Sequence, residues 1–260
     1  MDVSEDKFYR AHITKRVDFA PGLWMIRIDP GGEFRFTPGQ YATLGVEEAG
    51  QRRERPYSIA SSPYEKEIEF FFELVPHGEV TPTLYQLQLG AELSLRKVAK
   101  GRFTLDTKSG RTNHLLVCTV TGIAPFVSYI RTLREDWREG RFGGEHKLFL
   151  LGGASRSWEF GYLDEMRRIA QEAPWLEYVP TVSRPWEDEN WKDETGRADD
   201  ILRKYADMWG LDGSNSIAYL CGHPEMIEHA KGILRRRGFA GRETVREEVY
   251  WVPTKDAKAG

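Results

Sequence analysis

The sequence predicts a two-domain protein, in which an antiparallel six-stranded β-barrel is followed by a doubly wound parallel α/β sheet. Its 260 residues are enough for two domains of ordinary size. The first part holds short segments rich in β-branched and aromatic residues, separated by turn residues. After Asp106 the pattern changes to apolar strands that alternate with helices. We therefore place the domains at residues 1–106 and 107–260.

The strands expected in the first domain are short and end at turn residues. Typical boundaries are the Asp-Pro-Gly-Gly stretch at 29–32 and the Pro-Gly pair at 38–39. One short helix is expected at 82–89. Six such strands are typical of a barrel or a sandwich, and we expect the barrel. The strands are predicted at 8–17, 22–29, 40–46, 57–60, 68–75 and 92–98.

The second domain is predicted to be a parallel sheet with helices on both faces, because its strands are almost continuously apolar and helices follow them. Ligands of such sheets bind outside the carboxyl ends of the strands. A nucleotide-binding domain is therefore expected. The strands are predicted at 114–118, 146–153, 176–182, 216–222 and 243–251, and the helices at 125–137, 157–172, 198–207 and 224–237.

Composition excludes several classes of protein. With 37 Lys and Arg against 40 Asp and Glu, the net charge is -3, which argues against nucleic-acid binding. No apolar run approaches the roughly 18 residues of a membrane span, and the first residues lack a signal-peptide core, so a cytoplasmic location is expected. Cys118 and Cys221 are too few for a disulfide framework or a four-cysteine cluster. We predict no metal site, so electron chemistry would need an organic cofactor.

Residues 118–126 of the second domain, Cys-Thr-Val-Thr-Gly-Ile-Ala-Pro-Phe, follow the first parallel strand. Their pattern predicts a tight turn at Gly122 and a helix begun by Pro125. Backbone N–H groups at such a helix start favour a pyrophosphate. Ordinary loops between strand and helix are built in the same way, however, and a complete G-x-G-x-x-G is absent.

Arginines follow the next two strands, at Ser155-Arg156 and at Arg184, and Arg197 comes after Gly196. Arginines beyond adjacent strands of one sheet can converge on a dianion, because the guanidinium fork matches phosphate oxygens. A ribose 2′-phosphate is the natural candidate. The alternative is that each arginine is a solvated loop residue.

The first domain holds the tetrapeptide Arg55-Pro56-Tyr57-Ser58 at the end of a basic run. Arg can bind a phosphate, Tyr can stack on a flat ring, and Ser can donate a hydrogen bond to a ring nitrogen. Residues 77–82, with Gly78 and Thr81 before the short helix, form a second candidate phosphate site.

Taken in order, R-P-Y-S, G-x-x-T before a helix, T-G-I-A-P-F, S-R and C-G-H-P-E-M resemble the ferredoxin-NADP reductase family, and most of all its bacterial ferredoxin and flavodoxin reductases. The similarity covers about residues 8–251. It implies a FAD-binding barrel, an NADP-binding α/β domain, and an enzyme that moves hydride between NADP(H) and FAD and single electrons between FAD and ferredoxin or flavodoxin. A monomer is expected.

The resemblance also implies residue roles. Arg55 would hold the FAD pyrophosphate, Tyr57 would stack on the isoalloxazine, and Ser58 and Cys221 would be the catalytic residues. Where the family often has a turn glycine, this chain has Val120. The implied FAD contacts are Arg55, Pro56, Tyr57, Ser58, Phe72, Leu74, Glu79, Val80, Thr81, Thr121, Tyr250 and Trp251. The implied NADP contacts are Thr121, Gly122, Ser155, Arg156, Arg184, Arg197, Cys221 and Gly222.

Two other functions stay open at this point. One is a reductase component for an oxygenase, or a flavin reductase, that uses NAD(P)H. The other is a non-catalytic nucleotide-binding subunit, which the joint presence of Arg55, Tyr57, Ser58 and Cys221 disfavours. A basic cluster at the end of the barrel would steer acidic ferredoxins or flavodoxins to this chain. It comprises Arg96, Lys97, Lys100 and Arg102.

Overall fold

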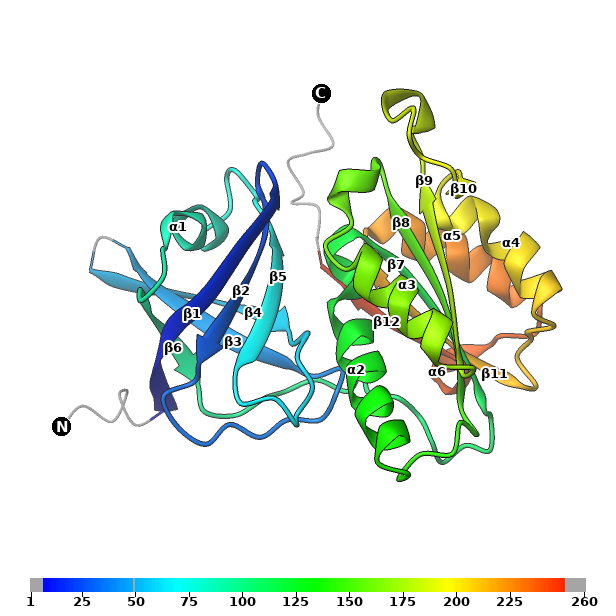
Figure 1. Ribbon diagram of the computed structural model, residues 1–260, viewed down its shortest axis with the longest axis horizontal. Helices are drawn as coiled ribbons and strands as arrows, with labels where there is room; N and C mark the ends of the chain where they lie inside the picture. Colours follow the sequence, from blue (N-terminus) through cyan, green and yellow to red (C-terminus); the bar gives the residue numbers. More distant parts are fainter. Residues whose placement is uncertain (1–6, 49, 251–260) are drawn as a thin grey trace. The chain divides into compact units, whose positions relative to one another are not determined.

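The computed structural model describes residues 7–48 and 50–250, which divide into two compact units (Figure 1). The first unit comprises the chain up to Leu105 together with Ala124–Arg141. The second comprises Asp106–Ile123 and the chain from Phe142 onward. No helix within these described ranges is long and apolar enough to cross a membrane.

The first unit is built on one antiparallel sheet of six strands, in the order β4-β3-β6-β1-β2-β5. This confirms the predicted six-stranded antiparallel barrel. The sheet curls around a core that includes the fully buried rings of Trp24, Phe70 and Phe72. Its strands are β1 (Phe8–Ala20), β2 (Leu23–Asp29), β3 (Tyr41–Glu48), β4 (Gln51–Ser58), β5 (Ile68–Glu73) and β6 (Glu92–Arg96).

Strand β4 begins earlier than predicted. The sequence pattern predicts this strand at 57–60, whereas in the structure it extends back over the basic run to Gln51 and ends at Ser58. The run forms a strand because β4 lies at the edge of the sheet, paired only with β3, so its charged side chains stay in water. Pro56, which has no N–H to donate, is tolerated at such an edge.

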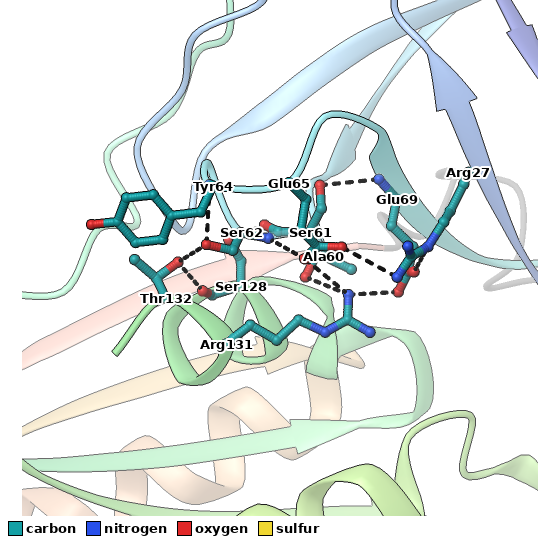
Figure 2. A network of polar contacts seen from close by, with 10 residues as sticks. All are labelled: Arg27, Ala60, Ser61, Ser62, Tyr64, Glu65, Glu69, Ser128, Arg131 and Thr132. Carbon is teal, nitrogen blue, oxygen red and sulfur yellow. Dashed lines mark hydrogen bonds and ion pairs between the residues drawn. The ribbon is translucent and has the colours of Figure 1, made fainter. Parts of the chain in front are cut away.

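Helix α2 (Ala124–Arg138) follows a strand of the second unit in sequence but packs in the first unit. Figure 2 shows the polar network that holds it there. The fully buried carboxylate of Glu69 on β5 accepts hydrogen bonds from Arg27 Nε at 2.6 Å and from Arg131 Nη1 of α2 at 2.9 Å. Ser128 of α2 donates to the carbonyl of Ser61 at 2.7 Å. Buried charges joined in this way fix α2 against β5.

The second unit contains one parallel sheet, in the order β10-β9-β8-β7-β11-β12, which confirms the predicted doubly wound fold. The chain order runs outward from β7 in both directions. The strands are β7 (Asn113–Thr119), β8 (Lys147–Ala154), β9 (Leu176–Val182), β10 (Glu194–Thr195), β11 (Ser216–Gly222) and β12 (Val245–Val249).

Helices cover the sheet of the second unit on both faces. Helices α4 (Ala198–Met208) and α5 (Pro224–Arg235) share an apolar core with β7, β8 and β11. Helix α3 (Leu163–Glu172) lies on the opposite face (Figure 1). The single helix predicted at 157–172 is wrong, because a 3-10 turn ends before Gly161 and α3 starts only at Leu163. The last strand likewise starts late, since Gly241–Thr244 forms the short helix α6.

A buried histidine on β7 makes the stability of the second unit depend on pH. Burial, and then the neighbouring His146 at 3.0 Å, lower the pKa of His114 to about 3. Below a pH of about 6.5 the unfolded chain takes up a proton that the folded chain excludes, so stability falls as the pH drops from there toward 3. The loss approaches about 1.4 kcal/mol per pH unit.

We expect His114→Gln to flatten this dependence. The measurement is the urea midpoint between pH 8 and pH 5, compared with wild type and with His77→Gln, a replacement of an exposed histidine. An equal slope in wild type and His114→Gln would show that His114 does not exclude a proton.

Candidate active site

On the first unit, the residues of the R-P-Y-S tetrapeptide lie on edge strand β4. Arg55 and Tyr57 alternate with Pro56 and therefore share one face of the strand, about 7 Å apart along it. The guanidinium of Arg55 forms an ion pair with the carboxylate of Glu79, which lies just before helix α1 (Thr81–Gln86). The structure thus brings together two motifs that are 24 residues apart.

The ring of Tyr57 closes the gap between the two edge strands β4 and β5. Its centroid lies 4.8 Å from that of Phe72, edge to face, and Phe72 in turn stacks on Trp24 at 5.1 Å. Burial raises the pKa of Tyr57, so its ring stays neutral at physiological pH. Ser58, the next residue, is buried.

The segment before α1 is shaped by Thr81. Its hydroxyl accepts from the N–H of Val75 at 3.0 Å and donates to the Val75 carbonyl at 3.3 Å. Both hydrogen bonds of the Thr81 hydroxyl are made to Val75, so it is not the group that would bind a diphosphate. Glu79, Val80 and Thr81 would contact a diphosphate through their backbone N–H groups instead. The N–H of Leu74 is also engaged, because it donates to the Gly22 carbonyl at 2.7 Å.

These residues fit a flavin dinucleotide. A cation suited to a pyrophosphate, a neutral ring suited to a flat heterocycle and the start of a helix lie along one edge of the sheet. The cation and the helix start are joined directly through the Arg55–Glu79 pair.

On the second unit, the direction of winding reverses at β7, between its neighbours β8 and β11. Ligands of open α/β sheets bind at such a reversal. The turn after β7 and the turn after β11 pack closely there. A Cβ atom on Gly122 would lie 2.3 Å from the Cys221 carbonyl oxygen, and one on Gly222 would lie 2.3 Å from Thr119 Oγ1. Only glycine fits at either position.

The turn after β7 differs from the expected one. We predicted a tight turn at Gly122, but the left-handed residue is Val120, with φ at 42°. Val120–Ile123 forms a 3-10 turn that holds the buried Thr121 and Gly122, and α2 follows from Ala124. A β-branched residue in this region of φ is strained, and this is the position at which the family often has glycine.

Cys221 is the second-to-last residue of β11 and pairs with Cys118 of β7, and both thiols are buried. Burial raises the pKa of Cys221 well above its ordinary value, with the nearby Glu248 acting in the same sense. The side chain is therefore a neutral thiol, suited to contact rather than to nucleophilic attack. The Tyr250 N–H donates to the Gly222 carbonyl at 3.3 Å, which holds the end of the described chain next to this turn. The predicted FAD contact Trp251 lies outside the described residues.

Ser155, Arg156 and Arg184 come together where β8 and β9 end. Backbone hydrogen bonds join the two loops, from Ser183 N to the Ala154 carbonyl and from Arg184 N to the Ser155 carbonyl, each at 3.0 Å. Arg197 starts helix α4 and pairs with Asp199 at 3.3 Å. These arginines are bound to acidic residues of the same chain, a feature that the loop pattern did not predict.

Two residues of the predicted basic cluster, Arg96 and Lys97, contact other side chains of the first unit. Arg96 donates to Glu54 at 2.6 Å, and the ammonium of Lys97 lies 5.3 Å from the ring of Tyr9. A docking role for Arg96, Lys97, Lys100 and Arg102 stays a prediction.

Comparison with known proteins finds one family for each half of the chain. The family described as "Oxidoreductase FAD-binding domain" matches residues 23–105, and "Oxidoreductase NAD-binding domain" matches residues 116–232. Over 231 residues the chain is 32% identical to ferredoxin–NADP reductase A of Sorangium cellulosum, covering 84% of this chain and 79% of that relative. This chain belongs to the ferredoxin–NADP reductase family. It is an oxidoreductase with FAD as a cofactor, as the resemblance of its motifs implied.

Further matches agree with this family. The ferredoxin–NADP reductase of Pseudomonas aeruginosa is 32% identical over 79% of this chain and 80% of that relative. A crystal structure of a ferredoxin NADP+ reductase from Neisseria gonorrhoeae superposes with a TM-score of 0.81 at 23% identity, covering 94% of this chain and 99% of that one, which confirms the fold. The toluate 1,2-dioxygenase electron transfer component of Pseudomonas putida is 27% identical, and the match covers 56% of its length.

Proposed function

We propose that this chain is an NADP(H)-dependent reductase that exchanges electrons with a ferredoxin or a flavodoxin through FAD. The proposal is supported by one feature on each unit. One is the Arg55–Glu79 and Tyr57–Phe72 arrangement on the edge of the barrel. The other is the close packing of Gly122 against Cys221 at the reversal point of the parallel sheet. A monomer acting in the cytoplasm is part of the same proposal.

When bound, FAD links two-electron transfer from a nicotinamide to single-electron transfer to a protein partner. The residues of this chain act by binding and orienting. Arg55 would hold the pyrophosphate, Tyr57 would offer its neutral ring for stacking, and Ser58 would donate a hydrogen bond to the flavin ring. Glycine at 122 and 222 would let a dinucleotide approach the backbone at the ends of β7 and β11.

We expect Cys221→Ala to slow reduction of the flavin by NADPH at least several-fold while FAD stays bound. The thiol is neutral and lies near the end of β11 at the proposed nicotinamide site, so its loss would loosen the packing that orients the nicotinamide. Stopped-flow single-turnover reduction gives the rate, and the flavin-to-protein ratio gives FAD retention. An unchanged single-turnover rate would remove Cys221 from the catalytic residues.

The partner is tested by cytochrome c reduction with NADPH, with and without added ferredoxin or flavodoxin. The proposal predicts that either carrier raises the rate severalfold in proportion to its concentration. No stimulation by either carrier, although NADPH reduces the flavin, would contradict a ferredoxin or flavodoxin partner.

Electron transfer to an oxygenase is the second candidate. It is supported by the similarity to the toluate dioxygenase component and to the xylene/toluene monooxygenase electron transfer component of Pseudomonas putida, which is 29% identical over 93% of this chain. In the cytochrome c assay, stimulation by an oxygenase ferredoxin alone would favour this candidate.

A further inference from the structure

The loops after β8 and β9 carry two carboxylates that are bound to the groups expected to hold a 2′-phosphate. Glu187 lies in a short 3-10 turn, Pro185–Glu187, directly after Arg184. Its Oε2 lies 2.5 Å from Arg156 Nε, and its Oε1 lies 3.6 Å from Arg184 Nη1. One carboxylate thus bridges both arginines.

Glu159 engages the remaining donors. Its Oε2 accepts the Ser155 N–H at 2.9 Å, and its Oε1 accepts from Arg156 Nη1 at 3.1 Å. Ser155, Arg156 and Arg184 therefore all face a carboxylate of these loops, and the fourth residue of the expected 2′-phosphate site, Arg197, faces Asp199. The two carboxylates offset the charges of Arg156 and Arg184 and so weaken the attraction that these two guanidinium groups offer a dianion.

These contacts have opposite effects on the two nicotinamide coenzymes. A 2′-phosphate must compete with Glu187 for the same guanidinium N–H groups, and the carboxylate repels it. A free 2′-hydroxyl carries no charge and can instead donate a hydrogen bond to a carboxylate, as acidic residues of dinucleotide-binding domains do.

Of the two carboxylates, Glu187 is the better placed to repel a 2′-phosphate and to accept a hydrogen bond from a 2′-hydroxyl. Glu159 is tied to the backbone N–H of Ser155, four residues earlier in the chain. Glu187 contacts side chains of both arginines, and about a third of its own side chain is exposed, so it is open to an incoming coenzyme.

We propose that Glu187 sets the coenzyme preference of this chain by occupying the arginines of the 2′-phosphate site, which lowers the preference for NADPH over NADH. The inference rests on the proposed function, since it assumes that the nicotinamide coenzyme binds at the ends of β8 and β9.

Nucleotide binding tests the inference without turnover. Isothermal titration of the flavin-loaded protein would measure the affinities for 2′-phospho-AMP and for 5′-AMP in wild type and Glu187→Gln. The control is Glu189→Gln, which removes the same charge two residues later from an exposed side chain. In Glu187→Gln we expect 2′-phospho-AMP to bind about tenfold tighter, because the guanidinium groups are freed from a charged competitor. Binding of 5′-AMP in that variant, and of both nucleotides in Glu189→Gln, should change by less than about twofold.

Equal or weaker binding of 2′-phospho-AMP by Glu187→Gln would overturn the inference, and weaker binding would mean that Glu187 holds the arginines in place for the phosphate. The inference would also be overturned if Glu187→Gln bound 5′-AMP more tightly by the same factor, or if Glu189→Gln gained as much affinity for 2′-phospho-AMP. The ratio of kcat/KM for NADPH to that for NADH should rise about tenfold in Glu187→Gln, in step with binding. If both coenzymes reduce the flavin and the ratio is unchanged, the inference alone fails. If neither nucleotide binds and neither coenzyme reduces the flavin, the proposed function fails with it.

Discussion

Replacing Arg55 by alanine is expected to weaken FAD binding about 10- to 100-fold and to yield a protein that loses flavin during purification. Arg55 is the cation of the proposed flavin-binding edge, half exposed on β4 and paired with Glu79 just before α1. A lost charge-assisted hydrogen bond to a pyrophosphate is worth about 1.5–3 kcal/mol, which corresponds to this change in affinity. The dissociation constant is measured by the recovery of flavin fluorescence on dilution.

The matched control for this experiment is Arg53→Ala. Arg53 lies two residues earlier on the same face of β4 and is also exposed, so its loss changes the charge of the strand equally. FAD affinity close to wild type is expected for that variant. Wild-type affinity in Arg55→Ala, or an equal loss in both variants, would contradict the assignment of the pyrophosphate to Arg55.

Replacing Glu69 by glutamine is expected to destabilise the first unit by about 3–5 kcal/mol, because it leaves two arginines without their buried partner. Glu69 is fully buried and binds Arg27 of β2 and Arg131 of α2 (Figure 2). Glu65, at 3.2 Å from Arg27 and 3.7 Å from Arg131, compensates only in part. For a protein of this size the midpoint of thermal unfolding should fall on the order of 10 °C.

Calorimetry of the flavin-loaded protein measures this shift. Glu67→Gln removes the same charge two residues earlier, outside the Glu69 network, and a shift of no more than about 2 °C is expected for it. A Glu69→Gln protein that unfolds within about 2 °C of wild type would show that the Arg27–Glu69–Arg131 network contributes little to stability.

The order of the elements could be predicted from the sequence because it depends on local patterns. Apolar strands such as Leu176–Val182 and Ser216–Gly222 are bounded by residues that end them, and their predicted limits agree with the structure. The basic run of β4 could not be recognised as a strand, because charged residues are tolerated there only since β4 lies at the edge of the sheet.

The candidate site residues could be predicted from their type and motif, whereas the residues that form ion pairs and hydrogen bonds with them could not. Glu69 is a charged residue between the apolar residues Ile68 and Phe70 of β5, and charged residues usually face solvent. It is buried because α2, about sixty residues later in the chain, packs over it. Glu187 belongs to an acidic segment that is typical of a solvent-exposed loop. Its contact with Arg156 depends on the hydrogen bonds between that loop and the end of β8, which the sequence does not reveal. Likewise, the positive φ of Val120 follows from packing and not from residue type.

We expect this chain to bind FAD and to reduce it with a nicotinamide coenzyme. The most direct test is the visible absorption spectrum of the purified protein, titrated with NADPH without oxygen. We expect flavin absorption bands at about one flavin per chain, which bleach as NADPH is added. A protein that stays colourless after incubation with FAD, or flavin bands that neither NADPH nor NADH bleaches, would contradict it.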